Sequence, residues 1–212
     1  MAFWLAPLLA SGGGGDSPPH ALEVERVMAL VNGVPILLSD IELAEVARLI
    51  PREPMESDPA YRETVIEALV ALELRWQNLE AAGIPGRIRV DLEAAWQRVV
   101  ELVGGEERLR AGMRERALQE SDLRLLVRRA AVVEAYVGSR FAPFVRPTPE
   151  ELETVWREEL RPRLLMEARP AESWEPYRAH LEQLVRERKL AAEVQRWTEE
   201  LEKRGEVARY RR

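Results

Sequence analysis

The sequence predicts a mainly α-helical protein with one small antiparallel sheet and about six helices. Three observations support this fold class. Apolar residues recur at the three- and four-residue spacing of amphipathic helices over most of the chain. Near the start, apolar and other residues alternate around an Asn-Gly pair, which is typical of a β-hairpin. At the end, Gly205 follows a helical pattern, and we expect Glu206–Tyr210 to be a strand that joins the hairpin in one sheet.

The hairpin is expected within Val24–Leu38, with its turn at Asn32-Gly33. Asn-Gly favours a type I′ turn because both central positions take positive φ. Ser39–Glu42 reads Ser-Asp-Ile-Glu, the spacing of a capping box, so a helix over Asp40–Leu49 should follow directly. The next two prolines are expected to end it.

The central helix of the core is expected to begin at Asp58, with Asp58 as N-cap and Pro59 in the first turn. It should run to Ala82 and stop at Gly83. Its apolar residues form two stripes, so both sides should be covered by other elements. Trp76 lies on one stripe and is expected to be a core residue.

Five further segments complete the expected fold. A capping box with Pro at its first helical position starts at Thr148, and Pro162 should stop the helix that follows. The last helix is long, roughly 45 Å. The expected segments are helices at Asp91–Val103, Glu106–Ala117, Glu120–Phe141, Thr148–Leu160 and Ser173–Arg204.

The composition excludes several kinds of chemistry. The 212 residues include no Cys, which excludes disulfides and thiolate metal sites. They include only two His, which argues against a catalytic serine–histidine relay. The formal charge of −6 argues against nonspecific binding to nucleic acid or anionic lipid. The sequence has no GxGxxG, GxxxxGK[ST], HExxH or GxSxG motif. We therefore expect no catalytic residues, metal site, cofactor or nucleic-acid partner.

The first 22 residues resemble the end of a secretory signal peptide followed by a flexible linker. Residues 2–10, AFWLAPLLA, are apolar and precede the small residues SGGGG, although no positive segment stands before them. The apolar run is too short to cross a bilayer as a helix. The expected location is the periplasm, or otherwise outside the cytoplasm.

Seven segments, taken in order, carry a resemblance to a known family: Val27–Ile36, Ser39–Glu42, Val65–Leu79, Ala81–Ile84, Leu118–Leu123, Thr148–Leu152 and Ser173–Tyr210. In this order they resemble the N-terminal region and the C-terminal helix and strand of the SurA family of periplasmic chaperones. The resemblance implies an apolar groove that holds extended segments of unfolded outer-membrane proteins. It also implies that the last helix and strand pack back on the N-terminal domain.

The chain departs from the SurA pattern in its middle. Members of the family usually carry one or two parvulin-type prolyl isomerase domains there, whereas residues 161–172 form only a short joint, too short for a domain. We therefore expect no isomerase activity. The expected organisation is a signal-like segment and linker at 1–22, a helical chaperone domain at 23–160, the joint at 161–172, and a C-terminal helix and strand at 173–212.

A chaperone that only holds its clients needs exposed apolar surface framed by charge. We expect two or three aromatic or methionine side chains to be accessible and to bind clients, and the candidates are those on the shorter helices or beside the joint. They are Trp96, Met113, Phe141, Phe144 and Trp156.

Two other functions are weighed against this one. The chain could be a structural or adaptor protein whose long helix Ser173–Arg204 pairs with a partner or, by domain swapping, with a second copy in a homodimer. It could instead be an enzyme with carboxylate chemistry, for which a concave pocket with two buried acids would be the sign.

Overall fold

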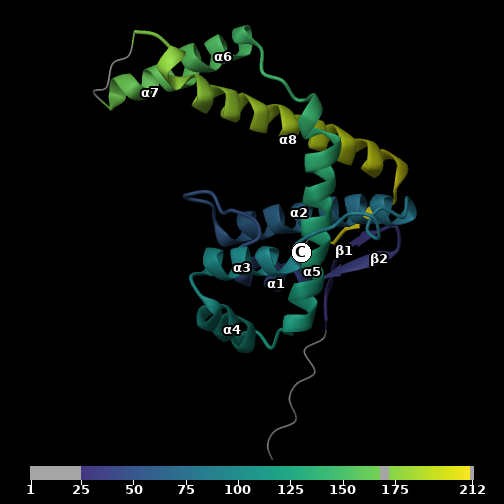
Figure 1. Cartoon of the computed structure of the whole chain (residues 1–212). Helices are drawn as coiled ribbons and strands as arrows, with labels where there is room; N and C mark the ends of the chain where they lie inside the picture. Colours follow the sequence, from purple (N-terminus) through teal and green to yellow (C-terminus); the bar gives the residue numbers. More distant parts are fainter. Residues whose placement is uncertain (1–24, 168–171, 211–212) are drawn as a thin grey trace, which may run out of the picture.

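The computed structural model describes residues 25–167 and 172–210, and it confirms a mainly helical fold with a small antiparallel sheet (Figure 1). The signal-like segment at 1–22 lies outside the described residues. The elements in chain order are β1 (Val27–Val31), β2 (Val34–Leu37), α1 (Leu38–Val46), α2 (Asp58–Ala81), α3 (Leu92–Val103), α4 (Glu106–Glu115), α5 (Glu120–Arg140), η1 (Ala142–Phe144), α6 (Pro149–Val155), η2 (Trp156–Leu160), α7 (Arg161–Met166), η3 (Glu175–Tyr177), α8 (Arg178–Arg204) and β3 (Val207–Arg209).

The sheet has the strand order β2-β1-β3, with both pairs antiparallel. Its hairpin turn takes positive φ at Asn32 (49°) and Gly33 (83°), as the Asn-Gly pair predicts. The last strand closes the sheet, because the N–H of Asn32 donates to the carbonyl oxygen of Glu206 (2.8 Å) and that of Tyr210 to Met28 (2.9 Å). The two ends of the described chain therefore meet in one sheet.

Two helix starts lie earlier than the sequence predicts. Strand β2 passes directly into α1, so Ser39 is already inside the helix and the prediction of its capping box is wrong. The side chain of Asp40 caps instead, because its carboxylate accepts the N–H of Leu37 (2.8 Å). Helix α2 is capped by Ser57, whose hydroxyl accepts the N–H of Ala60, and not by Asp58.

Helix α2 is the central helix of the body, as its two apolar stripes predict. Val65 and Leu69 pack with the sheet and α1, and both are buried. Trp76 and Leu79 pack with α5 in a second cluster, and Trp76 is buried as expected. A third cluster joins α1, α3, α4 and α5.

The long helix α8 contributes to two separate cores. Near its start, Leu181 and Val185 pack with Leu152, Trp156 and Leu164 in a cluster of their own. Near its end, Trp197 and Leu201 pack on the sheet and α2. We call residues 149–167 and 172–190 the arm, and residues 25–148 and 191–210 the body. Figure 1 shows α5 rising from the body to the level of α8, with the arm extending from there.

The helix that starts at Thr148 continues past Pro162, so the prediction that this proline stops it is wrong. Pro162 has no N–H, and a proline in a regular α-helix clashes with the preceding turn. The wider π turn η2 lies just before it, where the N–H of Arg161 donates to the carbonyl oxygen of Trp156. The helix thereby runs on as α7 to Met166, and half of the expected joint at 161–172 is helical.

Candidate binding surfaces

The five side chains expected to bind clients do not form one surface. Trp96 (5% exposed), Met113 (4%) and Trp156 (6%) are buried, so the expectation that these three are accessible is wrong. Each points into a core from the apolar face of its helix. Phe141 is half-buried, and its ring packs on Tyr136 and Trp197 where α5 meets α8. Only Phe144 of the five is well exposed, at 75%.

An apolar pocket lies between α3 and the first turns of α5, and we call it the α3–α5 pocket. Its volume is about 400 Å³, within the range of small-ligand and side-chain sites. Two leucines are exposed on its rim, Leu92 (45% exposed) and Leu125 (57%). The residues that line the pocket are Leu92, Trp96, Ser121, Arg124, Leu125, Val127 and Arg128.

Trp96 connects this pocket to the core behind it. Its indole packs with Val99 and Leu123 in the cluster of α3, α4 and α5. The guanidinium of Arg124 lies over its ring, 4.0 Å from the ring centroid, in a cation–π contact. Glu120 orients Arg124 by an ion pair of 2.7 Å one turn earlier on α5. Arginine and tryptophan therefore hold each other in a fixed arrangement at the pocket.

Leu125 is a sequence signal for this pocket that the helical spacing of the apolar stripe does not include. Leu125 lies off the apolar stripe of α5, beside Leu126, which packs inward. A leucine on the outer face of an amphipathic helix has no partner within that helix's core. Leu92 stands at the first residue of α3, where the chain enters the helix from outside the core.

A larger cavity of about 890 Å³ lies beside the loop after α1, and charged and apolar side chains line it in similar measure, Leu102 of α3 among them. Arg62 and Arg116 both pair with Glu45, at 3.4 and 2.9 Å. Arg52 pairs with Asp58 (2.5 Å), and Arg48 donates to the carbonyl oxygen of Leu102 (3.3 Å). These ion pairs and this hydrogen bond tie the loop to its neighbours, so the arginines of the cavity already have partners within the chain.

Two acids, Asp40 and Glu73, line a small cavity of about 50 Å³ with Arg129. Burial is the main cause that raises the pKa of Asp40, against the N–H of Leu37, which lowers it. Glu73 accepts from the side chains of Gln77 (2.8 Å) and Arg129 (3.0 Å). The space is far below the roughly 300 Å³ of an ordinary ligand pocket. Both acids have structural partners, so this pair gives no support to carboxylate catalysis.

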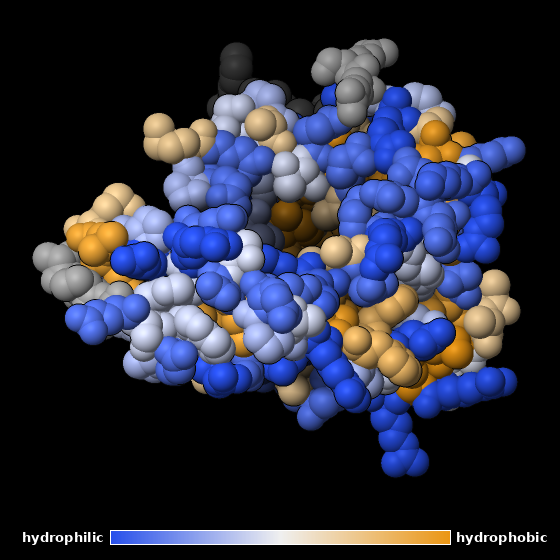
Figure 2. Space-filling model, turned by 90° about the horizontal axis from the view of Figure 1, so that it is seen from above, coloured by the Kyte–Doolittle hydropathy of each residue, from blue (hydrophilic) through white to orange (hydrophobic). Residues whose placement is uncertain are grey.

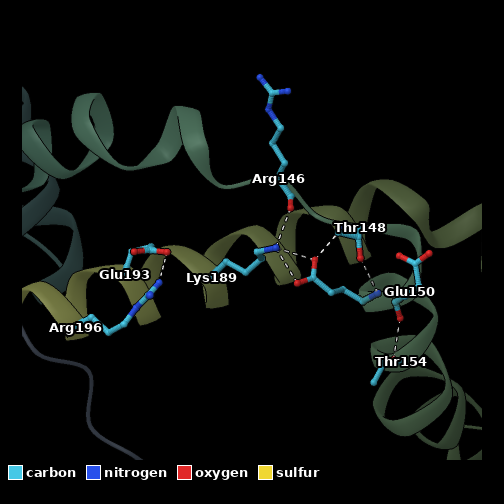
Figure 3. Close-up of polar contacts among 8 residues, drawn as sticks. Arg146, Thr148, Glu150, Thr154, Lys189, Glu193 and Arg196 are labelled. Carbon is cyan, nitrogen blue, oxygen red and sulfur yellow. Dashed lines mark hydrogen bonds and ion pairs between the residues drawn. The ribbon is translucent and has the colours of Figure 1, made fainter.

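A polar clasp fixes the start of the arm to the middle of α8 (Figure 3). Lys189 donates to the carbonyl oxygen of Arg146 (2.9 Å) and to both carboxylate oxygens of Glu151 (2.8 and 3.0 Å). The same carboxylate accepts the N–H of Thr148 (2.8 Å), which completes the predicted capping box. The hydrogen bond from Lys189 is the main cause that lowers the pKa of Glu151.

Within the described ranges, no group of three or more His, Asp or Glu side chains is placed to hold a metal ion. No helix in this part of the chain is both long enough and apolar enough to cross a membrane. Comparison of the sequence with protein-family models and with curated proteins finds no match.

Proposed function

We propose that this protein is a non-enzymatic chaperone that holds unfolded or extended polypeptide segments, with the α3–α5 pocket as a binding site. The observation that carries the proposal is an apolar pocket whose rim leaves Leu92 and Leu125 about half exposed beside charged side chains. Apolar surface framed by charge binds unfolded chains while the protein stays in solution. Periplasmic location and outer-membrane protein clients are part of this proposal, from the signal-like start and the resemblance to the SurA family.

The surface as a whole is compatible with such a role. Seen from above the arm, hydrophilic residues cover most of the molecule, and hydrophobic residues gather in separate patches and at the floor of a central hollow (Figure 2). Further large hydrophobic side chains are exposed on the arm, namely Leu165 (56%) and Met166 (83%).

The adaptor function has less support. The apolar residues of α8 that would bind a partner pack within the chain, near its start on the arm and near its end on the body. An adaptor function would be favoured by an apolar face of α8 that contacts nothing else in the chain. The contacts of this helix leave little apolar surface of that kind.

The test is suppression of aggregation of an unfolded outer-membrane protein at a stoichiometric ratio. We expect the wild-type protein to suppress light scattering, and Leu125→Gln to weaken suppression several-fold by making the rim polar. Glutamine is used because an added acid would pair with the arginines of the pocket. The matched control is Leu102→Gln, at an equally exposed leucine (56%) of α3 that lines the larger cavity beside the loop after α1 and not the α3–α5 pocket. No suppression by the wild type, or equal loss in both variants, would refute the proposal.

A further inference from the structure

The α3–α5 pocket carries two positive charges beside its apolar lining. Arg124 and Arg128 lie four residues apart on α5, so they stand one above the other on the same face of the helix. Glu120 pairs with Arg124, and both groups are partly exposed. In the part of the chain that the structure describes, Arg128 has no hydrogen bond or ion pair, and it is exposed.

An arginine such as Arg128, beside an apolar cavity, favours a carboxylate as its binding partner. A planar guanidinium binds a carboxylate through two parallel hydrogen bonds, and such bonds are among the strongest between side chains. Screening by water is weaker beside an apolar surface than in open solvent, so the attraction is larger there. A ligand that fills the cavity with a hydrophobic side chain thus places its neighbouring groups next to Arg128.

We propose that the α3–α5 pocket selects polypeptide segments in which a large hydrophobic residue is followed by an acidic residue. The hydrophobic side chain enters the cavity of about 400 Å³ between Leu92 and Leu125. The acidic side chain binds the guanidinium of Arg128. This inference rests on the proposed function, and it adds the kind of segment that the pocket prefers.

The net charge of the protein opposes the binding of acidic peptides, so net charge and the proposed site predict opposite preferences. With a formal charge of −6, the molecule repels acidic peptides over long range. A preference for acidic over neutral peptides must therefore come from a local site and cannot come from net charge. The opposite preference, for basic peptides, is the result that net charge alone would give.

The experiment uses three labelled peptides of equal length, each with two phenylalanines, followed by glutamate, glutamine or lysine. Fluorescence anisotropy with the full chain measures their affinities. We expect the glutamate peptide to bind roughly 2- to 5-fold more tightly than the glutamine peptide, as an ion pair with the exposed Arg128 provides. The lysine peptide should bind most weakly to the pocket.

Three variants show which residues cause the preference for the glutamate peptide. Arg128→Gln should remove most of the preference for glutamate and leave the melting temperature unchanged, because Arg128 has no partner within the described residues. Arg186→Gln, at an exposed arginine of the arm that likewise has no ion pair in the described chain, should keep the preference. Leu125→Gln should weaken the binding of all three peptides.

The outcomes separate the two proposals. Equal binding of the glutamate and glutamine peptides, with loss of both in Leu125→Gln, overturns the acidic preference and leaves the proposed function standing. Binding that Leu125→Gln does not change overturns the pocket as a binding site. If the preference for glutamate survives in Arg128→Gln, a residue other than Arg128 causes it. This result also overturns the inference.

Discussion

The side chain of Asn32 does more than allow the hairpin turn. Its Oδ1 accepts the N–H of Glu206 (2.8 Å), and its Nδ2 donates to Gln77 (2.8 Å) on α2. Gln77 in turn donates to the carbonyl oxygen of Val31 (3.1 Å) and to the buried carboxylate of Glu73. One turn residue therefore joins the hairpin, the start of β3 and α2, and a Gly at this position would keep the turn but lose the two bonds of the Asn32 side chain.

Asp40 should make the protein less stable at neutral pH than an uncharged residue of the same shape would. Burial raises its pKa, so the folded state takes up a proton more readily than the unfolded state. Its unfavourable contribution is present above the folded pKa and disappears as the pH falls through that pKa to the unfolded value.

We therefore expect Asp40→Asn to melt at a higher temperature than the wild type at pH 7, with a difference that vanishes near about pH 3. Asparagine keeps an oxygen that accepts the N–H of Leu37. The control Asp40→Ala loses that bond as well and should be less stable than Asp40→Asn by about 1 kcal/mol. A lower melting temperature of Asp40→Asn at pH 7 would contradict this account.

The position of the arm depends on the clasp around Lys189. We expect Lys189→Met to increase hydrogen exchange of the amides of α6 and η2, because the amine no longer bonds Glu151 and the carbonyl oxygen of Arg146. Amides of α2 in the body should exchange as in the wild type.

The chain offers a close control for this variant. Its only other lysine, Lys203, lies exposed in the last turn of α8, and Lys203→Met should leave exchange in the arm unchanged. The pKa of Glu151 is lowered, so the contribution of the clasp is present above the unfolded pKa of this carboxyl and is lost as the pH falls through its folded pKa. Arm protection that is the same in both variants would contradict the role of the clasp.

Elements were predictable from sequence where the signal was local. The Asn-Gly turn and the Thr148 capping box both depend on neighbours in the chain. The π turn before Pro162 was not predictable in this way, because a proline signals a helix end unless the preceding turn widens. The α3–α5 pocket depends on how α3 meets α5, and sequence spacing does not contain that packing.

Strand β3 ties the last residues that the structure describes to the start of the fold. Arg209 pairs with Glu67 of α2 (2.7 Å) and with Glu202 of α8 (2.8 Å), and these partners raise its pKa further. Deleting the last eight residues removes these pairs and the backbone bonds to β1.

We expect this deletion to lower the free energy of unfolding by about 2–4 kcal/mol, from several hydrogen bonds of roughly 1 kcal/mol each. Urea denaturation measures it, and Arg209→Gln, which keeps the strand, should lose less. An unchanged midpoint after the deletion would show that β3 does not hold the fold together.

The proposed function requires that unfolded clients contact the α3–α5 pocket. Site-specific photocrosslinking tests it most directly, with a photoreactive residue at Leu125 in one variant and at the equally exposed Leu102 in the other. With an unfolded outer-membrane protein present, we expect a strong crosslinked product from position 125 and little from position 102. Equal products, or a product from position 102 alone, would contradict it.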